Sequence, residues 1–237
     1  MSMYPYGRSA MPSQVGVRPA AQLSSAFLTQ AFFWMFLGLL VTTGVGMAVA
    51  SLPLTTLADL AGLVLPMVIV QLVVALALSL GIRAMPATLG LLLFFVYSAI
   101  TGVTVGLILV TYEIGSVLAA GSAAAAVFGG AALYGAVTGR DLTSLGAYLF
   151  MGLVGIIVAS LVNVFIGWQW LSFAVSVVGV VVFTGLTAYD VQRIKNGDVA
   201  VWAGSMEKGA VMAAFSLYLD FVNLFFMLLR LFGNTRD

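Results

Sequence analysis

Apolar residues run almost without interruption from residue 27 to residue 232, divided by short polar segments. A helix needs about 20 consecutive apolar residues to cross a bilayer, and each stretch is long enough. Strands of a membrane barrel would instead alternate apolar and polar residues over about ten positions, and these stretches are continuous. The pattern predicts seven transmembrane helices, at residues 27–50, 60–82, 86–111, 115–138, 144–166, 169–192 and 209–232.

The N-terminal segment has a different composition. Residues 1–26 are rich in Pro, Gly, Ser and Ala, and they contain two arginines but no acid. They lack the compact apolar core of a signal peptide. We therefore expect a flexible cytoplasmic tail at residues 1–26 and one seven-helix transmembrane domain at residues 27–233, with no room for a soluble domain.

Basic residues are distributed unevenly between the two ends of the predicted bundle. Loops that face the cytoplasm carry an excess of Lys and Arg, so this bias predicts orientation. Only Arg230 and Arg236 fall on the side opposite the N-terminus, so we expect the N-terminus in the cytoplasm. If the last stretch entered the membrane and returned, the C-terminus would lie there too. The residues on the N-terminal side are Arg8, Arg18, Arg83, Arg140, Arg193, Lys195 and Lys208.

Composition supports a membrane protein and excludes several kinds of site. The chain is 62% hydrophobic and 7% charged, whereas soluble domains contain about 25% charged residues. The lipid bilayer is therefore its main partner, and a net charge of +1 gives no reason to expect nucleic acid. The chain has no Cys and no His, so thiol nucleophiles, Cys or His metal sites and Ser-His-Asp triads are excluded. We expect no cofactor, and a response to pH near neutrality would have to come from a carboxylate.

The chain lacks residues that are essential in two other classes of membrane protein. A retinal-type receptor needs a lysine in its last span, but the two lysines, Lys195 and Lys208, precede that span. A nucleotide-driven pump needs a phosphate-binding motif such as Gly-x-x-x-x-Gly-Lys, which does not occur.

Two acidic residues lie within predicted spans. Asp190 is near the end of the sixth span, in FTGLTAYDVQRIKN at 183–196, and Asp220 is near the middle of the last. A charged side chain at the bilayer centre costs about 2.5–3.5 kcal/mol, and such residues usually face a bundle interior or a water-filled cavity. Hydrogen bonding between helices does not need a charge, so both acids are candidate functional residues.

Other polar side chains accompany the two acids on helix faces. Ser216, Asp220 and Asn223 share one face of the last span, because residues three and four apart are neighbours on a helix. Thr187 lies one turn before Asp190. Each neutral residue could line a pore or could simply hydrogen-bond to a neighbouring helix. The candidates of this kind are Gln71, Tyr97, Thr101, Thr187, Ser216 and Asn223.

Two arrangements would reduce the cost of these acids. Each acid could pair with a base, and Arg83, at the cytoplasmic end of the second span, is the best placed. Alternatively, Asp190 and Asp220 could pair with each other and share a proton. Their depths differ, because Asp190 lies about 9 Å and Asp220 about 16 Å from the predicted helix ends. For the two acids to lie at the same depth, the embedded part of the last helix would have to begin near residue 213. Spacing along the chain therefore does not decide whether the two acids pair.

At these residues the chain resembles the Bax inhibitor-1 (transmembrane Bax inhibitor motif) family, in its bacterial inner-membrane branch. The matching segments are TGLTAYDVQRIKN at 184–196, SLYLDFVNLFFMLLRLFG at 216–233, GRDLTSLG at 139–146 and SAITGVTVG at 98–106. The resemblance covers essentially the whole chain after about residue 25, and the first two segments together are specific.

The resemblance implies a seven-helix bundle with the last helix central. It also implies a pH-sensitive, calcium-permeable leak in the inner membrane, with Asp190 and Asp220 as a carboxylate pair on the ion path and as tentative Ca²⁺ ligands. Arg83 matches an arginine that engages the acid of the sixth span in the family. Some members carry an acid in the second span, where this chain has Gln71.

Three functions remain open from the sequence. In a leak channel, a shared proton would hold the acids together, and deprotonation would separate them and offer oxygen ligands, which suit Ca²⁺. A regulator that transports nothing would instead bind a membrane protease or another membrane protein through the tail or the loop at 193–208. An intramembrane aspartyl protease is disfavoured, because Leu217-Tyr218-Leu219 precedes Asp220 where that class has Gly-x-Gly. We therefore do not expect an enzyme.

Overall fold

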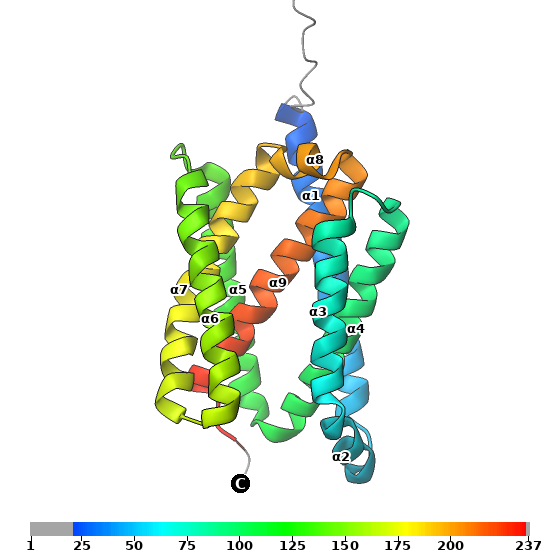
Figure 1. Ribbon diagram of the computed structural model, residues 1–237, viewed down its shortest axis with the longest axis vertical. Coiled ribbons are helices and arrows are strands. Elements are labelled where there is room, and N and C mark those ends of the chain that lie inside the picture. Colours follow the sequence, from blue (N-terminus) through cyan, green and yellow to red (C-terminus); the bar gives the residue numbers. More distant parts are fainter. Residues whose placement is uncertain (1–20, 236–237) are drawn as a thin grey trace, which may run out of the picture.

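The structure, a computed structural model, describes residues 21–235 and is a bundle of helices (Figure 1). Seven helices in this part of the chain are long and apolar enough to cross a membrane, which confirms the predicted fold class. They are α1 (Ala21–Ala50), α3 (Val64–Gly81), α4 (Ala87–Thr111), α5 (Ile114–Val137), α6 (Thr143–Ile166), α7 (Gln169–Lys195) and α9 (Met206–Phe232).

Two short helices were not predicted. α2 (Leu54–Gly62) precedes α3, and α8 (Asp198–Ala203) lies within the predicted loop at 193–208. Gly197 and Gly204 flank α8 with φ angles of 78° and 84°. Glycine adopts this left-handed conformation without steric cost, so it ends one helix and lets the next begin in a new direction.

The N-terminal boundary differs from the predicted one. α1 begins at Ala21, six residues before the predicted first span, so part of the segment assigned to the tail is helical. Residues 1–20, the rest of the predicted tail, lie outside the described residues.

The last helix is central, as the family resemblance implied. α9 packs against α1, α4, α5, α7 and α8, and it runs diagonally between α6 and α3 (Figure 1). In the most apolar 18-residue segment of α9, 67% of the residues are buried, against 11% in that of α3 and 6% in that of α6. α3 and α6 are therefore the helices most exposed to lipid. α9 starts beside α8 and ends at the opposite end of the bundle (Figure 1). It therefore crosses the bundle rather than entering and returning.

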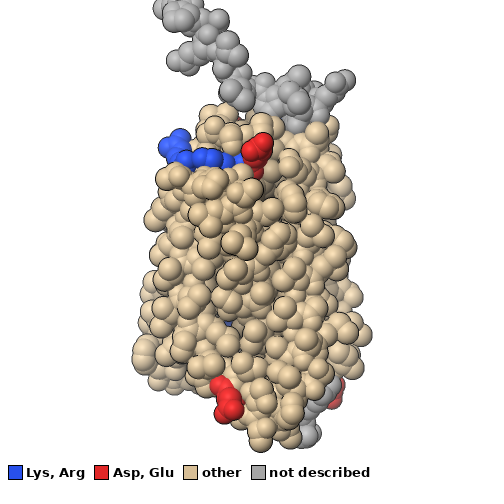
Figure 2. Space-filling view, turned by 90° about the vertical axis from the view of Figure 1, so that its right-hand side faces the viewer, with Lys and Arg blue, Asp and Glu red and all other residues tan. Residues whose placement is uncertain are grey.

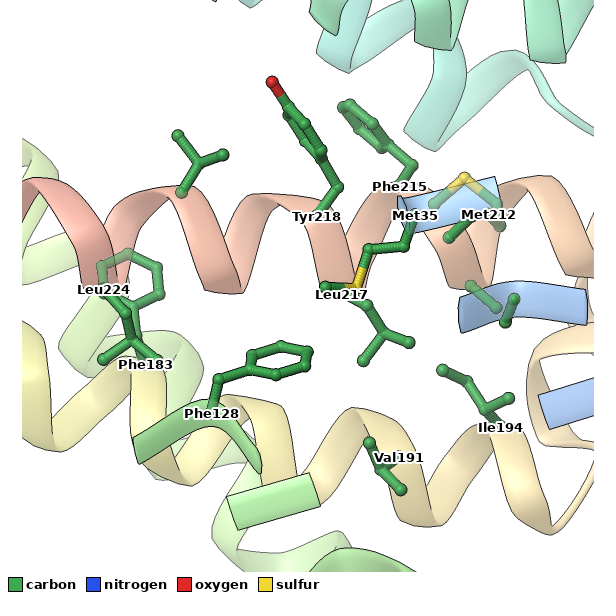
Figure 3. Packing of buried hydrophobic residues seen from close by; sticks show 14 of the residues in the cluster. Met35, Phe128, Phe183, Val191, Ile194, Met212, Phe215, Leu217, Tyr218 and Leu224 are labelled. Atoms are coloured by element: carbon green, nitrogen blue, oxygen red, sulfur yellow. The ribbon is translucent and has the colours of Figure 1, made fainter. Parts of the chain in front are cut away.

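Buried side chains cover two opposite sides of α9. Phe215 and Tyr218 point to one side, and Leu217 and Leu224 point to the other, toward α5 and α7 (Figure 3). Phe215 and Tyr218 make edge-to-face contacts with Phe94 of α4, at centroid distances of 6.1 and 5.3 Å. Aromatic pairs in this arrangement contribute about 0.5–1.5 kcal/mol beyond their area burial. α9 is thus fixed from both sides.

Charged side chains gather near the two ends of the bundle. The face in Figure 2 carries them at its top and bottom, with an almost uncharged band between them. Because α3, α5 and α7 all end beside α8, this end collects most of the bases of the described residues. They are Arg83, Arg140, Arg193, Lys195 and Lys208, whereas Arg230 lies at the opposite end.

α5 and α7 approach closely at a single glycine. A Cβ atom at Gly135 would overlap the carbonyl oxygen of Ala188 and would lie 2.9 Å from its carbonyl carbon. Small residues at such positions let transmembrane helices pack closely, which matters because apolar side chains gain little by leaving lipid. The contact positions α7 just before Asp190.

We predict that Gly135→Ala destabilises the protein by about 1–3 kcal/mol, because overpacking here meets backbone and cannot be relieved by a rotamer change. Gly130→Ala is the matched control, since a Cβ on Gly130 of the same helix meets nothing within 4 Å. Thermal unfolding in detergent measures both. Equal melting temperatures for the two variants would contradict the close approach.

Candidate functional site

A side-chain clamp holds the end of α7 against the start of α6. Gln192 Nε2 donates to the carbonyl oxygen of Arg140 at 2.7 Å, and Gln192 Oε1 accepts from the Leu142 N–H at 2.9 Å. The Asp141 carboxylate accepts from the Thr143 N–H at 2.9 Å where α6 begins. Hydrogen bonds from Thr143 also lower the pKa of exposed Asp141. The GRDLTSLG segment is therefore structural, and it fixes the part of α7 that carries Asp190.

The two intramembrane acids lie on neighbouring antiparallel helices, α7 and α9. The Ser216 hydroxyl interacts with the Asp190 carboxyl, and the Thr187 hydroxyl interacts with the Asp220 carboxyl. Because the two helices run in opposite directions, a step of one turn toward the C-terminus of one corresponds to a step of one turn toward the N-terminus of the other. The two acids are therefore offset by about one turn, roughly 5 Å along the bundle, and they interact electrostatically.

The diagonal course of α9 reduces the depth difference that spacing along the chain predicts (Figure 1). α9 begins at Met206, beyond α8, three residues earlier than the predicted span. Because the helix is inclined, each residue advances less than 1.5 Å across the membrane. Asp220 therefore lies less deep than its distance along α9 from Met206 would suggest.

The two carboxyl groups have different surroundings. Asp220 is buried, with 5% of its surface exposed. Its Oδ2 is the one buried side-chain oxygen or nitrogen between residues 25 and 235 that lacks a hydrogen-bond partner. Asp190 is only partly buried. A carboxylate oxygen without a partner in a nonpolar interior is costly, so this atom is suited to a proton or a cationic group.

Both acids line one large cavity of about 1300 Å³. α7 and α9 form its back, α3 and α6 form its sides, and Tyr97 of α4 and Trp202 of α8 complete it. The structure brings six of the predicted site residues together on this lining: Gln71, Tyr97, Asp190, Ser216, Asp220 and Asn223.

Thr101 and Thr187 lie behind the cavity wall. Both are buried, and each donates to the carbonyl oxygen four residues earlier in its own helix. Thr101 Oγ1 also accepts from Gln71 Nε2 at 2.8 Å, which ties α3 to α4. These two threonines therefore support the site from behind and do not line it.

Arg83 was expected to contact Asp190, but the structure places it against a different residue. Its Nε donates to the carbonyl oxygen of Trp202 at 2.6 Å, and its guanidinium lies over the Trp202 ring at 5.9 Å. α8 brings Trp202 to this position, and no pattern in the sequence predicted that helix. The base whose charge acts on Asp190 is Arg193, one turn later in α7, and Arg193 also lies over the Tyr189 ring at 5.3 Å.

A buried polar network on the other side of α9 was not predicted. Thr42 of α1 donates to the carbonyl oxygen of Ser98 at 2.9 Å, so its hydroxyl accepts from the Tyr218 hydroxyl at 2.6 Å. Tyr218 lies two residues before Asp220, on a different face of α9. No motif in the sequence connects Thr42 with Tyr218, because they are far apart along the chain.

Among the described residues no group of three or more acidic side chains could hold a metal ion. A cation in the cavity would draw on two carboxylates and on neutral oxygens such as those of Gln71, Ser216 and Asn223. Ca²⁺ takes six to eight oxygen ligands, so water would have to supply several of them. The arrangement suits passing contact with a cation better than a tightly held structural ion.

Comparison with known proteins agrees with the resemblance. A family model described as "Inhibitor of apoptosis-promoting Bax1" matches residues 24–237. The inner membrane protein YbhL of Escherichia coli K12 is 41% identical over 229 residues, which cover 93% of this chain and 96% of YbhL. The uncharacterized protein RP147 of Rickettsia prowazekii is 39% identical over 215 residues, 89% of this chain and 90% of that protein. None of these names refers to an enzymatic activity.

We predict that Tyr218→Phe lowers the free energy of unfolding by about 0.5–1.5 kcal/mol, the usual contribution of one hydrogen bond. The ring and its contacts with Phe94 remain, and the bond between the Tyr218 and Thr42 hydroxyls is lost. Tyr148→Phe is the control, because Tyr148 is 69% exposed on α6. Chemical denaturation in detergent compares them, and equal effects would show that the Thr42 bond contributes nothing.

Proposed function

Because the chain belongs to the Bax inhibitor-1 family of multi-pass inner-membrane proteins, we propose that it is a pH-sensitive cation leak, permeable to calcium. The observation that carries this proposal is the position of Asp190 and Asp220. They lie about one turn apart, on the two helices that form the back of one large cavity. The other acidic side chain in the seven transmembrane helices of the described chain is Glu207, which lies in the first turn of α9 at the end of the bundle.

The gate in this proposal is the α7–α9 contact. When one proton is shared, the pair carries a single negative charge and the two helices stay together. When both carboxyls are ionised, their repulsion in a medium of low dielectric favours separation. Separation would turn two oxygens toward the cavity and admit a cation, so the leak should increase as pH rises.

The cavity extends along much of the bundle, which supports its use as a path. Arg193 lines it near α8 and Arg230 lines it toward the other end. A conducting site must bind an ion strongly enough to admit it and weakly enough to release it. Two carboxylates with neutral oxygens meet this condition. The choice of calcium over other cations rests on the family resemblance.

The proposed orientation places the N-terminus and α8 in the cytoplasm. The bases of the described residues are concentrated at the α8 end, as expected for a cytoplasmic face. Asp190, five residues before the end of α7, then lies near the cytoplasmic entrance, and Asp220 lies one turn deeper.

We predict that Asp220→Asn and Asp190→Asn each lower Ca²⁺ flux at pH 8 by about tenfold or more, because a neutral amide offers a permeating cation far less attraction. Both variants should also lose most of the increase in flux between pH 6 and pH 8. Fluorescence of a Ca²⁺ indicator inside proteoliposomes provides the measurement.

Asp198→Asn is the matched control, since Asp198 is an exposed acid at the same end of the bundle. It should leave flux and its pH dependence unchanged. If the two intramembrane variants conduct like the parent at every pH, the proposed gate is wrong.

A further inference from the structure

The cavity that contains the two acids opens sideways toward the lipid. α3 packs on α4 and α6 packs on α7, but α3 and α6 make little or no contact with each other. Leu72 of α3 and Leu161 of α6 both line the cavity, and they are 59% and 61% exposed. The cavity walls therefore continue onto the lipid-facing surface, and a molecule dissolved in the bilayer could enter between the two helices.

We propose that this cavity binds a lipophilic amine that enters from the bilayer. Its protonated amino group would lie between the carboxyls of Asp190 and Asp220, and its alkyl chain would lie between α3 and α6. The inference uses the two acids of the proposed function, but it does not require that ions pass through the protein.

The acidic part of the cavity selects the head group. Asp220 Oδ2 is buried and lacks a hydrogen-bond partner, and a primary ammonium brings three N–H donors and a positive charge. Charge-assisted hydrogen bonds of this kind are about twice as strong as neutral ones. Gln71 uses its Nε2 for Thr101, so its carbonyl oxygen remains as a further acceptor on the lining.

The other charged groups of the cavity lie at its two ends. Arg193 is one turn beyond Asp190 toward α8, and Arg230 is near the end of α9. Tyr97 of α4 also lines the cavity. The middle of the cavity is therefore acidic, and this favours a cation there over the carboxylate or phosphate of an anionic lipid.

The side walls select the rest of the ligand. They are mostly apolar along both flanking helices, so an alkyl chain that arrives from lipid finds surroundings as apolar as those it leaves. The residues of these walls are Val68, Leu72 and Ala75 of α3 and Phe150, Leu153, Ile157 and Leu161 of α6. A single alkyl chain suits these walls, because it has no polar atom that would need a partner there.

The test is equilibrium binding of radiolabelled dodecylamine to the full-length protein in lipid nanodiscs, without Ca²⁺, with empty nanodiscs as the background. Dodecanol and dodecanoate match the chain and replace the head group by a neutral one or an anion. We expect saturable binding of dodecylamine, at least tenfold tighter than either. Asp220→Asn should weaken it about tenfold or more, since it removes a charged partner.

A pair of neighbouring residues on α6 tests the lateral entrance. Ile157 and Val158 are 57% and 55% exposed, but Ile157 lines the cavity and Val158 does not. Ile157→Trp should weaken binding, whereas Val158→Trp should leave it unchanged. Thermal unfolding of each variant verifies that it is folded.

Three results would overturn the inference: dodecanol binding as tightly as dodecylamine, dodecanoate binding more tightly, or Asp220→Asn binding dodecylamine like the parent. The binding experiment and the flux experiment can give negative results independently of each other. Amine binding that depends on Asp220, together with Ca²⁺ flux that does not, would contradict the leak and retain the amine site. The reverse result would contradict the amine site alone.

Discussion

The rest of the structure depends on the burial of one carboxyl group, that of Asp220, on the central helix of a membrane protein. An acid in this position is costly, and no group of the described residues forms a hydrogen bond with its Oδ2. The fold limits the cost by surrounding both acids with hydroxyl and amide groups, and it places Asp190 one turn away from Asp220. In the proposed function this pair responds to the proton concentration, because the proton that one acid holds determines whether the other can ionise.

α9 combines a fixed side with a side that faces open space. Toward α1 and α4 it is held by the Thr42–Tyr218 bond and by the edge-to-face contacts of Phe215 and Tyr218 with Phe94. Toward α3 and α6 it presents Ser216, Asp220 and Asn223 to the cavity. A rigid attachment on one side allows small changes at the acids to alter the cavity without disturbing the core, since packed interiors yield little.

The sequence could predict which site residues lie together only where those residues share one face of a single helix. Ser216, Asp220 and Asn223 were placed together because they are three and four residues apart, and all three line the cavity. Arg83 was assigned to Asp190 because both lie near the same end of the bundle. In the structure Arg83 instead donates a hydrogen bond to Trp202. Position along a helix does not determine which neighbouring helix a long side chain reaches.

The sequence by itself determined the membrane environment, the seven spans and the two residues whose charge needs an explanation. These follow from local properties, namely the length of each apolar stretch and the cost of a carboxylate within it. Only the tertiary structure decided that α9 is inclined, that α8 redirects the chain, and that Asp220 lies opposite Thr187 while Asp190 lies opposite Ser216. It also decided that α3 and α6 stay apart, which opens the cavity to lipid. The reason is physical: every apolar face is equally compatible with lipid and with another helix, so the arrangement follows from close contacts such as Gly135 on Ala188.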